Sequence, residues 1–329
     1  MDAKSPLPLE SAFPVVHRDF RKNPVATIMR TNMISWAVLF SLGAIWGLAM
    51  PIMRIAVSTG HQQLGLIFWQ SLISCAALGI FLLVNGGFRG LNRRRLATSA
   101  IISFVGTILP GFCAYKAAYH LPAGVMSIII SLVPMTTLPI ALLIGLEKFQ
   151  TTRMLGIIFG AIAIFLLLGP DASLPDPSAA IFVLVAAGAS IFYGIEANFV
   201  AKFGTAGLGP VEILFWASLI GAAVCGPLAL ISGQWVDLTV AWGAPEFALL
   251  TLAIMHAFGY SSYVWLVGYA GSVFSTQVAY LVTLFGVFWS IVLLQEHYSG
   301  WIWAALAFMV VGLFLVRPKR SQSAAMATR

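Results

Sequence analysis

The most constraining feature of the sequence is a stretch of 49 residues, from Phe247 to Gln295, that contains no Asp, Glu, Lys or Arg. As one helix it would be about 74 Å long, more than twice the roughly 30 Å hydrocarbon core of a bilayer. The chain must therefore turn once within the stretch, and Gly268, Gly271 and Ser272 suit a tight reversal. Two consecutive membrane-spanning helices are predicted here.

The composition extends this prediction to the whole chain. Hydrophobic residues make up 60% and charged residues 9% of the sequence, against about 45–50% and about 25% in ordinary soluble domains. Such a chain cannot cover a water-exposed surface, so we predict an all-α polytopic membrane protein. The three cysteines lie in apolar runs without metal-ligand spacing, so neither a disulfide scaffold, a metal site nor a cofactor is expected.

Ten apolar spans follow a polar leader, and each is long enough to cross a bilayer. Residues 1–32 are predicted to form a cytoplasmic tail, because they are rich in charge and proline and contain no signal-peptide core. Residues 318–329 form a second cytoplasmic tail. The predicted spans are 33–57, 63–84, 97–118, 123–145, 153–169, 179–201, 211–231, 246–267, 272–293 and 299–316.

The basic residues set the orientation. With the N-terminus in the cytoplasm, 16 of the 18 Lys and Arg residues fall on the cytoplasmic side. Only Arg54 and Lys116 lie near the outer ends of helices. The net charge of +7 is thus explained by topology, and no nucleic-acid partner is expected.

The chain repeats itself at an offset of 149 residues. Glu147 then falls on Glu296, and the reversal at Pro122-Ala123 falls on Gly271-Ser272. This divides the membrane region into two five-helix units, 33–169 and 178–317. Because five is odd, the second unit enters the membrane inverted, an arrangement typical of secondary transporters with substrate sites near the midplane.

Short motifs resemble those of the EamA family in the drug/metabolite transporter superfamily. They are Ala44-Ile45-Trp46-Gly47 with Arg54, the stretch from Tyr119 through Ala123 to Pro134 with Leu146-Glu147, and Gln295-Glu296. The sequence departs from the pattern at Phe68-Trp69-Gln70, where an Arg is often found, and at Thr283, which matches Pro134. The resemblance implies ten helices, two cytoplasmic termini and export of small metabolites such as amino acids.

Glu196 and His256 are the candidates for proton coupling. A carboxylate within a span costs about 2.5–3.5 kcal/mol on insertion scales and usually faces a cavity. Glu196 shares a helix face with Tyr193, and His256 shares a stripe with Tyr260. Glu196 could bind a substrate amine or exchange a proton, or it could serve helix packing. His256 could relay protons, or it could be a neutral side chain bonded between helices.

The remaining candidates for a substrate cavity lie in the fourth span, its mirror and the first span. Ser127, Ser131 and Pro134 follow one another at helical spacing. They either line a cavity, where the proline frees backbone carbonyls, or form a packing kink. In the mirror span, 272–293, the cavity candidates are Gln277 and Tyr280. In the first span, 33–57, the candidate is Trp46.

Four charged residues have structural alternatives. Glu147 and Glu296 precede helices and are interpreted as caps at the positive end of the helix that follows. Arg54 and Lys116 could guide an anionic group or snorkel to headgroups.

Three functions remain open. The first is an inner-membrane, multi-pass exporter of small molecules, surrounded by membrane lipid, with protons as the candidate coupling ion. The second is a lipid-intermediate flippase of the same superfamily. The third, an intramembrane enzyme, is disfavoured because no GxSxG or HExxH motif occurs.

Overall fold

The computed structural model describes residues 24–88, 90–168, 174, 176–270, 272–275 and 277–316, and these residues form helices and no strand. The predicted tails lie mostly outside this part of the chain. The helix over the first span begins at Pro24, nine residues before the predicted start at residue 33. A helix can continue beyond an apolar span because its backbone hydrogen bonds are internal, and proline fits a first helical position.

Each predicted span falls on one helix or on a chain of helices. The elements are α2 (Pro24–Ala56), α3 (Gln63–Val84), α4 (Arg93–Ser103), the π-helix η1 (Phe104–Ile108), α5 (Leu109–His120), α6 (Ala123–Ile130), α7 (Val133–Leu143), α8 (Thr151–Leu168), the short 3₁₀ helix η2 (Pro177–Ala179), α9 (Ala180–Phe203), α10 (Pro210–Ile231), α11 (Ala244–Ala270), α12 (Ser272–Ser275), α13 (Val278–Leu294) and α14 (Gly300–Val316).

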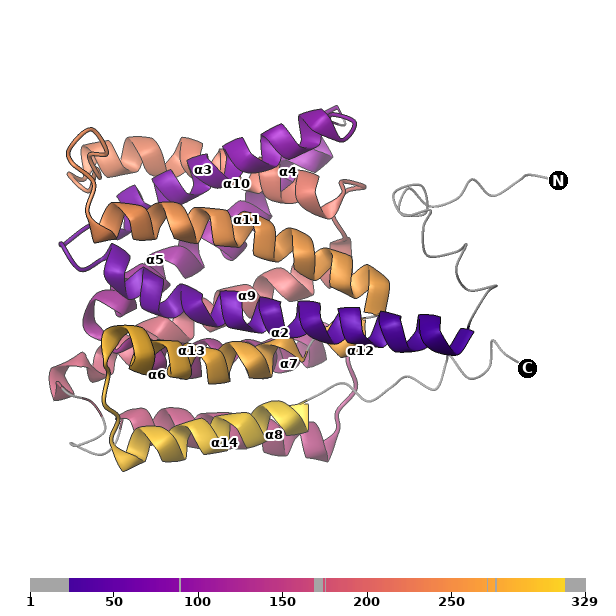
Figure 1. The fold of residues 1–329 in the computed structure, drawn as a ribbon, viewed down its shortest axis with the longest axis vertical. Helices are drawn as coiled ribbons and strands as arrows, with labels where there is room; N and C mark the ends of the chain where they lie inside the picture. The colour runs from indigo at the N-terminus through magenta and orange to yellow at the C-terminus, as the bar shows by residue number, and fades with distance from the viewer. Residues whose placement is uncertain are drawn as a thin grey trace.

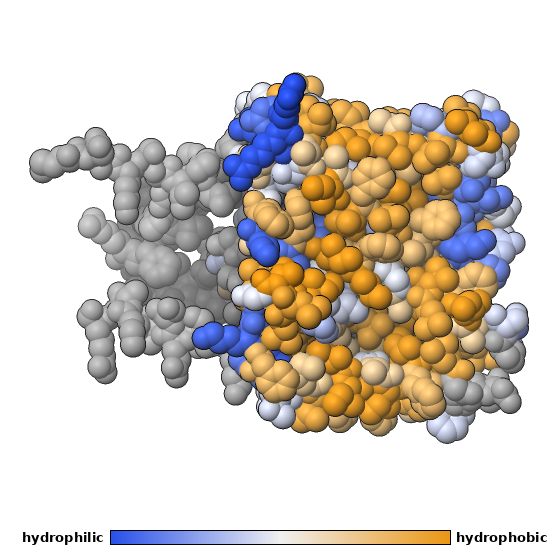
Figure 2. All heavy atoms as spheres, turned by 180° about the vertical axis from the view of Figure 1, so that it is seen from behind, coloured by the Kyte–Doolittle hydropathy of each residue, from blue (hydrophilic) through white to orange (hydrophobic). Residues whose placement is uncertain are grey.

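Seven helical runs among the described residues are long and apolar enough to cross a membrane. Two shorter apolar helices, α13 and α14, accompany them. The face in Figure 2 is mostly hydrophobic across its middle, and hydrophilic residues gather at its two rims. This distribution is that of a multi-pass membrane protein, with an apolar belt for the lipid and polar ends for water.

The helices run roughly side by side (Figure 1), and their contacts come in matching sets. α8 packs along α14, and α3 packs along α10. α2 lies against α11 and α13, while α9 lies against α5, α6 and α7. Likewise α3 contacts α11, and α10 contacts α4.

Two of the membrane runs contain irregular turns, each next to a proline. α6 ends before Ser131, and Pro134 lies in the first turn of α7, where its missing N–H has no intrahelical partner to lose. Between α4 and α5 the helix widens, and the Leu109 N–H bonds the Phe104 carbonyl, five residues back. Pro110 has no N–H to offer the carbonyl of Gly106, so this wider turn removes a clash that a regular helix would have.

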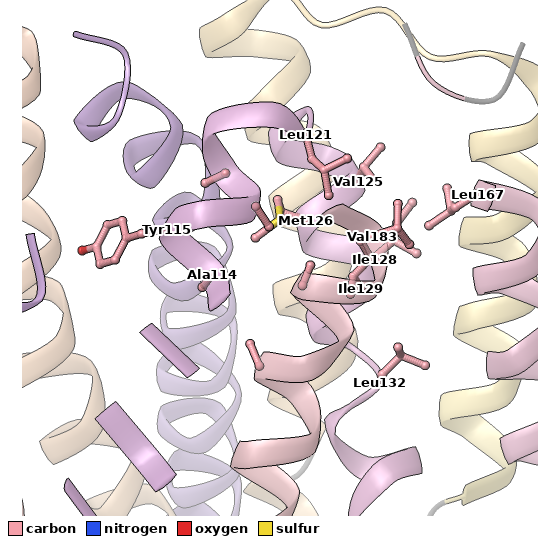
Figure 3. Packing of buried hydrophobic residues seen from close by; sticks show 14 of the residues in the cluster. Ala114, Tyr115, Leu121, Val125, Met126, Ile128, Ile129, Leu132, Leu167 and Val183 are labelled. Carbon is pink, nitrogen blue, oxygen red and sulfur yellow. The ribbon is translucent and has the colours of Figure 1, made fainter. Parts of the chain in front are cut away.

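The largest buried cluster joins α5, α6, α8 and α9 (Figure 3). Val125, Ile128 and Leu167 are fully buried within it. Tyr115 differs from the others in Figure 3, because its ring points away from the group. The packed cluster therefore leaves one polar tip facing a different part of the protein.

Candidate functional site

A cavity of about 60 Å³ lies among α2, α3, η1, α5, α9, α10 and α11. This volume exceeds the roughly 10–15 Å³ that a cavity needs to hold one water molecule. Several walls are polar, although all the elements are membrane helices. The lining residues are Met53, Ile67, Gln70, Ser71, Ser74, Gly106, Thr107, Gly111, Ala114, Tyr115, Tyr193, Ser218 and His256.

Two of the polar walls are held by hydrogen bonds. The Tyr115 hydroxyl donates to Gln70 Oε1, which joins α5 to α3 across the cavity. Ser74 Oγ donates to the Ala253 carbonyl at 3.3 Å and joins α3 to α11. Sequence reasoning missed Gln70, Ser74 and Tyr115. Polar residues within predicted spans were the available signal.

Three serine hydroxyls near this cavity are buried without a hydrogen-bond partner among the described residues. They belong to Ser71 on α3 and to Ser99 and Ser103 on α4. A Cβ on Gly221 of α10 would lie 3.1 Å from Ser71 Oγ and 3.5 Å from Ser103 Oγ. The hydroxyls of Ser71 and Ser103 therefore both lie next to Gly221. Buried hydroxyls of this kind usually bond ordered water. Of these three serines, Ser71 lines the cavity.

Glu196 lies against Gly106 of the π-helix, which lines the cavity, although Glu196 itself is not one of the lining residues. A Cβ added to Gly106 would lie within 2.6 Å of both carboxylate oxygens and of Cδ, so only glycine admits the carboxylate here. Gly106 is near the middle of the predicted span 97–118. The Glu196 carboxylate makes no hydrogen bond or ion pair with the described residues, which is unusual for a charge within a membrane.

Three other predicted residues lie at the cavity or near Glu196. Tyr193 and His256 line the cavity. Tyr193 and Tyr260 are within electrostatic range of the Glu196 carboxylate. His256, like Glu196, has no hydrogen-bond partner in the described part of the chain. The tertiary structure therefore places Tyr193 and His256, from two helices far apart in sequence, on the wall of one cavity.

Trp46 lies beside this group without lining the cavity. Its indole packs against Gly259 of α11, where a Cβ would meet the ring. Its ring centroid is 5.4 Å from that of Tyr263. The residue therefore fixes α2 against α11, the helix that carries His256.

Ser127, Ser131 and Pro134 lie away from the cavity. Ser127 Oγ donates to the Ala123 carbonyl at 3.0 Å, and Ser131 Oγ donates to the Ser127 carbonyl at 3.0 Å and contacts Thr283 Oγ1 on α13. Both serines are buried. This part of α6 therefore forms a tight contact with α13.

Gln277 and Tyr280 line a separate groove. Its volume is about 240 Å³, and it lies between α2, α13 and α14 with Trp36, Leu39, Leu281 and Phe314 as its other walls. Trp36 and Phe314 are 46% and 65% exposed, so the groove opens on the outside of the bundle. It is mostly apolar and distinct from the central cavity.

The charged residues near the helix ends make structural contacts. Glu296 accepts from the backbone N–H of Ala123 at 2.8 Å and of Gly124 at 3.2 Å, and so caps α6. The predicted cap was of the following helix, α14. The prediction considered only the next helix in the sequence, whereas the folded protein places Glu296 beside the start of α6.

The predictions for Glu147, Arg54 and Lys116 have different outcomes. Glu147 pairs with Arg153 at 2.8 Å, and Arg153 Nε also donates to the Val316 carbonyl at the end of α14. Arg54 donates from Nη1 to the carbonyls of Ala118 and Tyr119, both at 2.5 Å. Its guanidinium therefore caps the end of α5. Lys116 is exposed.

The fold and the cavity define a polytopic helical membrane protein with a polar site between its helices. The model of the EamA-like transporter family matches residues 33–169 and again residues 180–317. The chain therefore belongs to the EamA-like transporter family. The family and the helical fold point to a transporter and not to an enzyme.

Two further comparisons were made. A solved structure described as "Crystal structure of protein" is similar to this chain at 17% sequence identity and a TM-score of 0.57, and the match covers 86% of this chain and 97% of that one. At this identity the likeness concerns the fold alone. No curated protein matches the chain.

Proposed function

We propose that this protein is a secondary transporter that exports small metabolites such as amino acids by alternating access. The observation that carries the proposal is the position of the polar cavity. Its walls come from both family matches: Gln70 and Tyr115 belong to the first, and Tyr193 and His256 to the second. Transporters built from inverted repeats bind their substrates at such an interface.

The helix contacts support the inversion of the two repeats. In chain order, α2 corresponds to α9, α5 to α11, and α6 with α7 to α13. The contacts of α2 with α11 and α13 then correspond to those of α9 with α5 and with α6 and α7. The pairs α3–α10 and α8–α14 each correspond to themselves. A two-fold axis in the membrane plane relates contacts in this way.

The proposed topology has ten spans in the inner (plasma) membrane, with both termini in the cytoplasm. α2 begins and α14 ends toward the same side of the bundle (Figure 1), as an even number of crossings requires. The bias of 16 of 18 basic residues toward one side gives that side as the cytoplasm.

Glu196 and His256 are the proposed proton-coupling residues. Both lie within membrane helices, at or beside the cavity, without a hydrogen-bond partner among the described residues. A group without a fixed partner is free to exchange a proton or bind a substrate. Protons are therefore the proposed coupling ions, and lipid and a small-molecule substrate are the other partners.

The test is uptake of a pooled metabolite mixture into proteoliposomes, with and without an imposed pH gradient. Glu196→Gln keeps the side-chain shape and removes the charge, so we expect normal insertion and a loss of flux or of its pH dependence. Asp237→Asn, in an exposed loop, is the matched control. Normal pH-dependent flux in Glu196→Gln would end the role of Glu196, and His256→Gln would then be measured.

The outer groove favours one alternative, a lipid-intermediate flippase. Its walls are mostly apolar, and exposed Trp36 and Phe314 border it on the side that lipid would cover. A fluorescent lipid-flip assay in the same proteoliposomes separates the two functions. Lipid translocation that requires Tyr280, with no metabolite flux, would favour the flippase.

A further inference from the structure

We propose that the central cavity selects substrates that carry a cationic amine and no carboxylate, with Glu196 as the anion that binds the amine. This inference rests on the proposed function and narrows its substrate class from small metabolites to amines without a carboxylate. It is carried by the charges around the cavity and by the contact between Glu196 and Gly106.

A carboxylate lies near the cavity, and no Lys or Arg lines it. The lining residues are hydroxyls, one amide, one imidazole and apolar groups, and they include no Lys or Arg. The two basic residues at the outer ends of neighbouring helices are engaged elsewhere: Arg54 binds the end of α5, and Lys116 is exposed. Glu196 is the carboxylate at this site, and no described cation neutralises it.

The contact with Gly106 leaves the carboxylate available to a ligand. Both oxygens and Cδ lie at similar distances from the position of a Cβ on Gly106, all within 2.6 Å. The glycine therefore faces the flat side of the carboxylate. Hydrogen bonds to a carboxylate form near its plane, at the edges of the oxygens, so this contact does not block them. Gly106 of the π-helix thus positions the Glu196 carboxylate and leaves its oxygen atoms free to accept hydrogen bonds.

The surroundings of the carboxylate suit a cation of small size. Tyr193 and Tyr260 lie within electrostatic range of it, and Tyr115 lies across the cavity. Aromatic rings attract ammonium groups through their faces. An ammonium group has about the size of a water molecule, and the empty space of about 60 Å³ accommodates it.

A substrate carboxylate would find little to bind in this cavity. It would repel Glu196, and the one basic group among the lining residues is His256. The other titratable groups that face the site are the tyrosines at 115, 193 and 260. An amino acid would therefore need a protonated His256 to hold its carboxylate, whereas an amine needs only Glu196.

The test measures binding of compounds that share a skeleton and differ in charge. Phenethylamine, phenylalanine and 3-phenylpropionate are titrated into the purified full-length protein in detergent, and pentylamine, norleucine and hexanoate form a second set. We expect each amine to bind at least tenfold more tightly than its amino acid, and the acids not to bind. In Glu196→Gln the preference should fall below threefold, while Asp237→Asn should retain it.

Gly106→Ala tests whether Gly106 positions the Glu196 carboxylate. The added methyl would meet the end of a flexible side chain, so the protein should still fold while the carboxylate moves. We expect at least a tenfold loss of amine affinity in Gly106→Ala, and no further loss when Gly106→Ala is added to Glu196→Ala. An equal loss of amine affinity in the wild-type and Glu196→Ala proteins would show that Gly106 acts through packing. That result would overturn its role in positioning the carboxylate.

The outcomes separate this inference from the proposed function. Equal or tighter binding of the amino acids, or no binding of either amine, overturns the amine selectivity even if amino acids are transported. His256→Gln then shows whether His256 holds the carboxylate. Amine binding that depends on Glu196, without flux of any compound in proteoliposomes, overturns the transporter and leaves the binding site intact.

Discussion

Glu296 offers a test of how the outer ends of the two family units are joined. Its carboxylate accepts from the N–H groups of Ala123 and Gly124 at the start of α6, and the Tyr298 hydroxyl donates to it. Those N–H groups have no intrahelical partner. Glu296→Ala should therefore leave the start of α6 uncapped and destabilise the protein.

The magnitude follows from the two backbone contacts. Loss of a helix N-cap costs about 0.5–2 kcal/mol, and hydrogen bonds to a charged group contribute about 1.5–3 kcal/mol each. Because the two bonds share one carboxylate, we expect about 2–4 kcal/mol for Glu296→Ala. Glu296→Gln keeps one acceptor oxygen and should cost about half as much.

The assay is thermal melting of the purified protein in detergent, followed by tryptophan fluorescence. Glu147→Gln is the matched control, because Glu147 is the repeat counterpart of Glu296 and pairs with Arg153 in a partly exposed position. The Glu147 side chain is 41% exposed and caps no helix N–H group in the described part of the chain, so its loss should cost less than that of Glu296. A melting temperature of Glu296→Ala equal to that of the wild type, or to that of Glu147→Gln, would refute the capping argument.

Three further predictions concern topology, hydration and pH. A reporter fused after Arg329 should behave as cytoplasmic, and periplasmic alkaline phosphatase activity would contradict an even number of spans. Ser71→Cys should react with a small water-soluble thiol reagent, because Ser71 lines the polar cavity, whereas the same change at tightly packed Ser127 should stay unreactive. Hydrogen bonds from the Thr239 hydroxyl and N–H lower the pKa of Asp237. That contribution is present above the ordinary pKa of Asp and is lost as pH falls through the lowered value, so Thr239→Val should raise the Asp237 pKa in an NMR titration, and an unchanged value would contradict it.

The sequence alone predicted the helical elements well, because bilayer thickness fixes how long an apolar run must be. The span predicted over 63–84 has the same bounds as α3, and the one over 211–231 differs from α10 by one residue. Glu196 could also be selected, since a carboxylate within an apolar run is costly.

Only the tertiary structure decided which side chains meet. Ser127 and Tyr193 are both polar residues within predicted spans, yet Tyr193 lines the cavity and Ser127 packs on α13. Glu296 caps α6, 173 residues earlier, and not the helix beside it in sequence. The place of Gly106 beneath Glu196 depends on a π-helix, for which Pro110 was the single local signal. Helical periodicity defines the face on which a residue lies, whereas the neighbour across that face is set by the packing of the whole bundle.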